Sequence, residues 1–284
     1  MTRPNSPAAS SFGPLTNHLL STLVERDQYL FTSRDARRIV RRNASAANKL
    51  LHTLVRQGHI RRLEKGKFML QSTIADAETS SKHEFLVAMQ LVQPSYIAYW
   101  TALHYHGLTE QLANVVFVAT PKQKKAMRIQ GIAYRFVTLA KTKFFGTETQ
   151  QIGGRPFDKL RAGSFQISDP EKTVVDCFAH PECCGGMIEA AKGLWNGLHE
   201  HRLDLDRLAR YAERLGNRAV LKRIGYLIEF YQIPANGRLT RWLEHLSAGY
   251  NPLDPLGSRR GTHNARWRLL VNRSPIELSD WRIH

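Results

Sequence analysis

The sequence predicts an α+β protein in two parts, and three observations lead to this prediction. Three segments with apolar residues at helical spacing come first, and two short strand-like runs joined by a glycine turn follow them. Strand-like and helix-like segments then alternate to about residue 178, after which helices dominate. This order predicts an N-terminal winged helix-turn-helix over residues 15–75, followed by a mixed α/β domain over residues 85–284 with a helical C-terminal half. A chain of 284 residues is long enough for both.

The three N-terminal helices are predicted from their apolar faces and their caps. The first carries Leu15, Leu19, Leu20, Leu23 and Val24 at helical spacing. Thr32 or Ser33 caps the second, whose inward residues are Ala36, Ile39 and Val40. After the turn Arg41-Arg42-Asn43, Ser45 is expected to cap the third, whose inward residues are Ala47, Leu50, Leu51, Leu54 and Val55. Gly58 is expected to end this helix.

A hairpin and a longer mixed region complete the prediction. Strands over 60–63 and 68–70 are joined by Glu64-Lys65-Gly66-Lys67. Residues 1–14 are expected to be a disordered tail, and residues 71–83 a linker or the start of an interdomain helix. Strands are expected over 115–119, 132–139, 147–152, 165–167 and 267–272. Helices are expected over 85–92, 95–105, 170–178, 187–199, 204–215, 218–231 and 239–246.

Charge favours a polyanionic partner. The formal net charge is +17, and a surplus of that size suggests nucleic acid or an acidic membrane surface. The stretch from Arg26 to Lys67 holds twelve Lys and Arg residues against three Asp and Glu residues, more than half of the excess. The concentration of this positive charge on one small helical fold favours double-stranded DNA as the partner.

The third helix is the candidate for the major groove. Asn pairs well with adenine, and Lys reaches guanine or phosphate, while recognition helices use their N-terminal residues on base edges. Arginines beside the helix and cations of the hairpin are expected along the phosphate backbone. The predicted DNA-binding residues are Arg37, Arg38, Arg41, Arg42, Asn43, Ser45, Asn48, Lys49, His52, Arg61, Arg62, Lys65 and Lys67. A winged helix that mediates only protein contacts is the alternative.

Other features exclude several classes of protein. Cys177, Cys183 and Cys184 cannot form a disulfide framework and lack zinc-ligand spacing. No signal peptide, long apolar span or phosphate-binding glycine motif occurs. We therefore expect a cytoplasmic protein without metal, cofactor or catalytic residues.

Two clusters admit a catalytic interpretation. Asp169, Glu171, Lys172 and Asp176 could serve a metal-dependent nuclease, although Ser168 or Asp169 as helix cap, with Pro170 in the first turn, is the simpler explanation. His104 and His106 lie in an aromatic run and could act as acid–base groups, but a core helix face is more common. The cation runs at 122–128 and 259–268 are either solvated or secondary contacts.

Beyond these patterns, the chain resembles the AbiEi-type antitoxins of type IV toxin–antitoxin systems. The resemblance is generic over RQGHIRRLEKGKFML and more specific in SYIAYWTALHYHGLTEQ, NVVFVAT, GIAYRFVTL, KFFG, SDPEKTVVDCFAHPECCGG and LDPLGSRRGTHNARWRLLVN. It implies that the winged helix binds inverted repeats in the promoter of its own operon and represses it. It also implies that the C-terminal domain neutralises a co-encoded nucleotidyltransferase-like toxin without requiring a stable complex.

One segment departs from the family pattern. PFDKLRAGS, residues 156–164, separates two strands that follow each other almost directly in the family, and it looks like an inserted surface loop with Gly163 as a turn residue. The remaining alternatives are a nuclease targeted by a winged helix and a toxin-binding adaptor that does not bind DNA.

Overall fold

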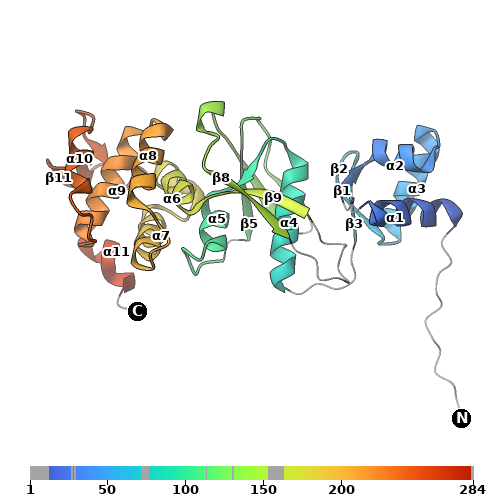
Figure 1. Cartoon of the computed structure of the whole chain (residues 1–284), viewed down its shortest axis with the longest axis horizontal. Helices are drawn as coiled ribbons and strands as arrows, with labels where there is room; N and C mark the ends of the chain where they lie inside the picture. Colours follow the sequence, from blue (N-terminus) through green and yellow to red (C-terminus); the bar gives the residue numbers. More distant parts are fainter. Residues whose placement is uncertain are drawn as a thin grey trace, which may run out of the picture. The chain divides into compact units, whose positions relative to one another are not determined.

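The structure, a computed structural model, describes residues 13–26, 28, 30–71, 77–112, 114–129, 131–152 and 163–282. It is a mixed α+β fold with helices and several separate sheets (Figure 1). The predicted tail lies outside the described residues as far as residue 12, and so does the inserted segment from 156 to 162. Gly163, expected in a turn, instead begins strand β9 (Gly163–Ser168).

Two compact units make up the chain. The described residues up to Leu91, together with 151–164, belong to the first unit, and Val92–Gln150 and Phe165 onward form the second. Residues 71–83 were predicted to be a linker or the start of an interdomain helix, and residues 72–76 lie outside the described residues. Residues from Ala77 onward form the long helix α4 (Ala77–Leu91), which contacts a strand of the first unit.

The part of the first unit that precedes α4 places three helices beside a small antiparallel sheet. Its helices are α1 (Pro14–Glu25), α2 (Ser33–Val40) and α3 (Ala44–Arg56). Its strands are β1 (Leu30–Thr32), β2 (Ile60–Glu64) and β3 (Lys67–Leu70), in the order β1-β3-β2. The three predicted helices and the hairpin are confirmed. Strand β1 was not predicted, because three residues are too few to show a period.

Local signals explain where these helices begin and end. Thr32, one of the two predicted caps, begins α2, and it does so in a capping box with Asp35 that was not predicted. The cap of α3 is Asn43 rather than Ser45, because the Asn43 side chain accepts a hydrogen bond from the Ala46 amide at 2.9 Å. Gly58 has φ +77°, which lets its amide and the next reach back to the carbonyls of α3.

An apolar core joins α1, α2 and α3 to the sheet of the first unit. Leu19 and Leu23 of α1 meet Ala36 of α2, Leu51 of α3 and Phe68 of β3. Of the apolar residues whose spacing predicted α1, Leu15 and Val24 are 39% and 38% exposed and do not belong to this core. They lie at the two ends of α1, where the helix extends past the core.

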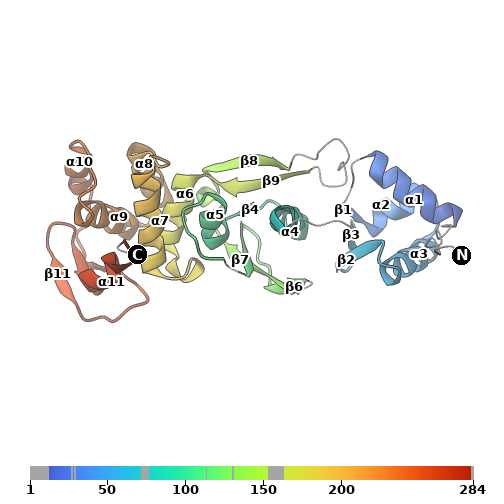
Figure 2. The ribbon, with the colours of Figure 1, turned by 90° about the horizontal axis from the view of Figure 1, so that it is seen from below.

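The second unit is built on a six-stranded mixed sheet, in the order β6-β7-β5-β4-β9-β8. Its strands are β4 (Tyr96–Ile97), β5 (Val115–Thr120), β6 (Met127–Ile129), β7 (Ile132–Thr138), β8 (Thr147–Ile152) and β9. Strands β5 and β7 are parallel, as are β4 and β9. Figure 2 shows β8 and β9 running side by side. The strands at β5, β7, β8 and β9 were predicted.

The unpredicted strand β4 corrects one helix. Residues 95–105 were expected to be helical throughout, but Tyr96 and Ile97 pair with Ala119 and Val118 of β5. Helix α5 (Tyr99–Tyr105) therefore begins only after this pairing ends.

Helices of the second unit surround one central helix, α6 (Pro170–Ala179), whose residues from Glu171 to Phe178 are all buried. It contacts α5, α7 (Met187–His199), α8 (Leu205–Leu215) and α9 (Arg218–Phe230). Helix α10 (Arg238–Glu244) packs on α8 and α9. The α7 to α10 region confirms the predicted helical C-terminal half.

A small sheet and a short helix complete this unit. Strand β12 (Leu269–Val271) lies between β10 (Asn251–Pro252) and β11 (Thr262–Asn264), and α11 (Pro275–Ser279) follows. Trp267, which was predicted to begin this strand, lies just before β12 and is fully buried. No helix in the described part of the chain combines the length and the apolar character needed to cross a membrane.

Candidate nucleic-acid interface

Helix α3 presents a polar face to solvent. Ala47, Leu51 and Leu54 point into the core, so the residues between them are turned outward. Ser45, Asn48, Lys49 and His52 are all exposed, and their side chains have no hydrogen-bond or ionic partner among the described residues. Four side chains able to contact bases or phosphates therefore lie free along one side of the helix.

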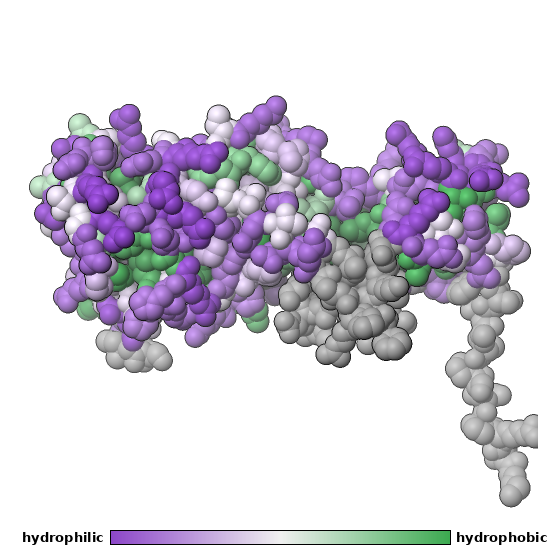
Figure 3. Space-filling view, in the orientation of Figure 1, coloured by the Kyte–Doolittle hydropathy of each residue, from purple (hydrophilic) through white to green (hydrophobic). Residues whose placement is uncertain are grey.

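Four arginines adjoin this face. Arg37 and Arg38 lie in the last turn of α2, and Arg41 and Arg42 lie in the turn that joins α2 to α3. All four are exposed, and none has an ionic partner in the described structure. Asp35, the one acid of α2, is occupied by its capping box. Figure 3 shows hydrophilic residues gathered over α2.

The β2–β3 hairpin divides its cations between two roles. Arg62 and Lys65 are exposed, and the Arg62 Nε donates to the carbonyl of Glu64 at 3.4 Å. Arg61 lies against α4: its guanidinium is 3.7 Å from Glu84, and its side chain is 11% exposed. The outward direction predicted for Arg61 is therefore wrong.

Lys67 is also engaged with α4, although its side chain is 32% exposed. Its ammonium donates to the carbonyls of Gln90 at 2.7 Å and Leu91 at 3.3 Å, at the end of α4, and pairs with Glu64 at 2.7 Å. Of the thirteen predicted DNA-binding residues, Arg61 and Lys67 thus hold α4, and Asn43 caps α3. The other ten remain on the surface.

The carboxylates of the nuclease alternative are occupied by the fold. Asp169 caps α6, with Oδ1 accepting from the Lys172 amide and Oδ2 from the Tyr211 hydroxyl, both at 2.8 Å. Glu171 is 1% exposed, accepts from the Asp204 amide at 2.7 Å, and pairs with Arg207. The predicted helix cap at Asp169 is confirmed.

Lys172 belongs to a buried cluster. Its ammonium pairs with Asp176, lies 3.2 Å from the Tyr96 hydroxyl and sits 4.9 Å above the ring of Phe145. Burial raises the pKa of the Asp176 carboxyl even though the ammonium of Lys172 lowers it. Both side chains are inaccessible to a substrate. In the described residues, no group of three or more His, Cys, Asp or Glu side chains is arranged to hold a metal ion.

The two histidines of the aromatic run have different environments. His104 is exposed, whereas the His106 Nε2 lies 2.7 Å from the carbonyl oxygen of Ser168. Burial lowers the pKa of His106 from 6.5. The neutral ring donates to that carbonyl, so His106 is a partly buried residue that links α5 to the end of β9.

The C-terminal cation run is partly engaged. Arg266 pairs with Glu229 at 2.8 Å, and Arg268 donates to the carbonyl of Leu246 at 3.0 Å. Arg259 and Arg260 stay exposed, with no side-chain partner among the described residues. In the other run, Arg128 donates to the carbonyl of Gly131 at 2.8 Å. All three cysteines are buried as free thiols.

Comparison with known proteins gives a fold but no family. No family model matches the chain, and no curated protein matches it. Among solved structures, the fold is similar to the crystal structure of the Rv2827c protein from Mycobacterium tuberculosis, with a TM-score of 0.62 and 15% sequence identity over 96% of each chain. At that identity the likeness concerns the fold alone.

Proposed function

We propose that the first unit is a winged helix-turn-helix that binds double-stranded DNA, with α3 as its recognition helix. Three helices followed by the β2–β3 hairpin is the element order of this motif, and α2 with α3 corresponds to its two-helix core. Ser45, Asn48 and Lys49 in the first half of α3 are the base-contacting residues. The hairpin tip, with Arg62 and Lys65, is the wing.

One observation carries this proposal. The outward face of α3 bears polar and cationic side chains without partners, and the only acid of α2 is sequestered in its own capping box. Unpaired arginines beside such a helix match the phosphate contacts that position DNA-binding helices. A surface used only for protein contacts would be expected to carry more apolar area at its centre.

We further propose that the protein represses its own operon and neutralises a co-encoded nucleotidyltransferase-like toxin in the cytoplasm, without catalysing a reaction itself. Support comes from the sequence resemblance to AbiEi-type antitoxins, which is strongest in the second unit. The acids and the lysine of α6 also favour a non-enzymatic role, because each is consumed by capping or by buried pairing. Inverted repeats would place one copy of α3 on each half-site.

A titration against the DNA upstream of the gene, beside random DNA of equal length and at two salt concentrations, tests the regulator. We expect tighter binding to the upstream DNA that persists at the higher salt. Binding of both DNAs with equal affinity would overturn sequence-specific regulation. Unchanged affinity in the Arg42→Ala and Lys49→Ala variants would favour an adaptor without a DNA role.

Co-expression with the neighbouring toxin gene tests the second activity. We expect the wild-type protein to restore growth. A variant that no longer binds DNA should also do so when both genes are expressed from unrelated promoters. Degradation of DNA that needs divalent ions and disappears in Asp169→Ala would instead establish the nuclease alternative.

A further inference from the structure

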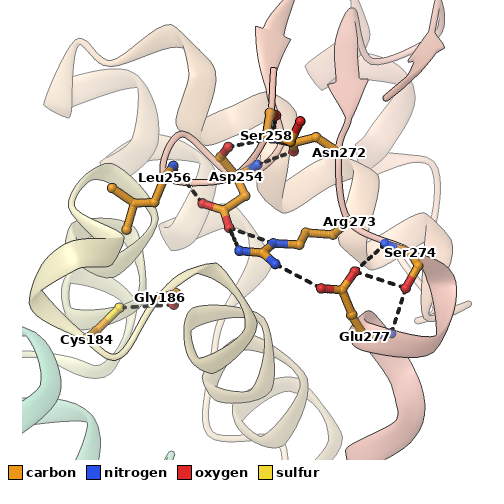
Figure 4. A network of polar contacts seen from close by, with 9 residues as sticks. All are labelled: Cys184, Gly186, Asp254, Leu256, Ser258, Asn272, Arg273, Ser274 and Glu277. Carbon is orange, nitrogen blue, oxygen red and sulfur yellow. Dashed lines mark hydrogen bonds and ion pairs between the residues drawn. The ribbon is translucent and has the colours of Figure 1, made fainter. Parts of the chain in front are cut away.

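A loop near the end of the second unit is held in place by buried polar groups. Asp254, only 1% exposed, accepts hydrogen bonds from the Leu256 amide at 2.9 Å and from the Arg273 Nε at 2.7 Å (Figure 4). Asn272 accepts from the Asp254 amide at 2.9 Å and donates to the carbonyls of Asp254 and Ser258 at 2.8 and 2.6 Å. We refer to residues 254–261 as the arginine loop.

Its far end is fixed just as closely. Gly261 packs so tightly on the carbonyl of Val271 that a Cβ atom there would overlap it, so only glycine fits at this position. Strand β11 begins at the next residue and pairs antiparallel with β12. Arg273 also binds Glu277 at 2.9 Å, which ties the base of the loop to α11. The backbone of the loop is therefore anchored at both ends.

The side chains that this loop displays are not used by the fold. Leu256 is 56% exposed, and Arg259 and Arg260 are exposed without a side-chain partner among the described residues. Tyr250, which is 49% exposed, stands edge-on to His263 at 5.0 Å. A loop whose base is held rigidly and whose exposed side chains contact no other part of the described fold is typical of a binding loop.

A cavity of about 510 Å³ adjoins the loop. Arg260, His263 and Tyr226 are among the residues that line it, and none of the lining residues is acidic. Strand β11 lies at an edge of its sheet, so one side of its backbone is unpaired within the sheet. The charge of Arg273 is already balanced by Asp254 and Glu277, which leaves Arg259 and Arg260 as the available cations.

We propose that the arginine loop, with this cavity and Tyr250, is a docking surface for an extended, acidic segment of a partner protein. Arginine forks bind carboxylates in a bidentate manner, and two adjacent arginines without internal acid partners are available for such a ligand. The apolar groups Leu256 and Tyr250 distinguish a protein partner from nucleic acid, because protein interfaces combine aromatic, aliphatic and arginine contacts. This surface belongs to the second unit and is independent of α3.

The test uses the full chain and a fluorescein-labelled peptide in which glutamate and leucine alternate. Fluorescence anisotropy measures its affinity for the wild type and for Arg259→Glu/Arg260→Glu. We expect the double variant to bind about tenfold more weakly, because both interfacial charges are reversed. Leu256→Asn should also weaken binding, although it leaves the charge unchanged. Thermal melting checks that each variant stays folded, as expected for exposed positions.

A matched control distinguishes the effect of the arginine loop from the effect of the net charge of the protein. Lys122→Glu/Lys125→Glu changes the charge of the same unit by the same amount, at exposed residues whose side chains have no partner in the described structure. It should retain wild-type affinity. Equal loss in both double variants, or equal binding of a peptide with lysine in place of glutamate, would overturn the proposal. Displacement of the peptide by single-stranded DNA at lower concentration than by unlabelled peptide would assign the surface to nucleic acid instead.

Discussion

The ammonium of Lys67 lies 2.7 Å from the backbone carbonyl oxygen of Gln90 and so closes the C-terminal end of α4. A cation at this position satisfies carbonyls that have no partner within the helix and interacts favourably with the helix dipole. The lysine that the sequence assigned to DNA contact is instead the residue that fastens α4 to β3.

Replacing Lys67 should therefore affect stability and leave DNA binding largely intact. Lys67→Met removes the hydrogen bonds to α4, and we expect the free energy of unfolding to fall by about 1–3 kcal/mol, measured by chemical denaturation. The matched control is Lys65→Met, at an exposed residue of the same hairpin. It should leave stability unchanged and reduce the number of counterions released on DNA binding by about one, as measured from the salt dependence of the affinity. The reverse pattern would place Lys67 on DNA.

The two classes of proposed DNA contact should differ in sequence dependence. Asn48→Ala should cost about 1–3 kcal/mol on the upstream DNA and little on random DNA, because it removes a base contact. Arg42→Ala should weaken binding to both DNAs and reduce the salt slope by about one. Anisotropy titrations over a series of salt concentrations measure both effects. Equal losses on both DNAs for Asn48→Ala would remove Asn48 from base recognition.

Removal of Lys172 from its buried pair with Asp176 should make the stability of the protein depend on pH. Lys172→Met leaves the carboxylate without its counter-ion, and breaking a buried pair costs about 3–5 kcal/mol at neutral pH. Burial already raises the pKa of Asp176 above 3.8, and loss of the ammonium raises it further. The folded variant then holds its proton more tightly than the unfolded chain, so its stability falls as pH rises above 3.8.

Denaturation of this variant across the acidic range measures the effect, with the wild type beside it. The deficit should be smallest at low pH, where Asp176 is protonated. Lys172→Met/Asp176→Leu should recover much of the lost stability, because no charge remains buried. A single variant as stable as the wild type at neutral pH would show that the pair is not needed.

His106 should give the opposite pH dependence. Its pKa in the folded protein is below 6.5 because of burial, so below that pH the unfolded chain takes up the proton more readily. This contribution to stability is present above pH 6.5 and is lost as pH falls below it. His106→Gln should flatten that part of the stability profile, while His104→Gln, at an exposed position, should not. Identical slopes in the two variants would contradict this assignment.

Two helical glycines should tolerate alanine differently. A Cβ atom on Gly225 of α9 would overlap the ring of the buried Trp267, so Gly225→Ala should lower stability by about 3 kcal/mol. On Gly193 of α7 the nearest atom is a Leu103 methyl at 2.9 Å, the end of a flexible side chain. Gly193→Ala should change stability by about 1 kcal/mol at most. Thermal melting compares them, and equal losses would disprove close packing at Trp267.

Elements with strong local signals were predictable. The apolar spacing of α3, the cap at Thr32 and the helix stop at Gly58 all lie within a few residues of what they determine. The polar face of α3 followed directly, because once Leu51 and Leu54 turn inward, Asn48 and Lys49 must turn outward.

Features that depend on distant partners were not predictable. Arg61 and Lys67 were predicted to be DNA-binding cations of the hairpin. Their partners Glu84 and Gln90 lie about two dozen residues further along the chain, so no local pattern indicates these contacts. Strand β4 was not predicted because two residues are too few to show an alternating pattern. The pairing of Tyr96 and Ile97 with β5 determines their extended conformation. The support of the arginine loop depends on Asn272 and Arg273, which lie 18 and 19 residues beyond Asp254.

The cores of the two units also differ in when their residues are synthesised during translation. The first core uses residues from Leu19 to Leu70, whereas the second joins Tyr96 to Trp267 and Leu278. During translation, the first core is complete while most of the second is still unsynthesised. A messenger truncated within the second region would therefore encode a protein that keeps α3 and lacks Trp267. Under the proposed function, such a product would occupy the operator while offering no protection against the toxin.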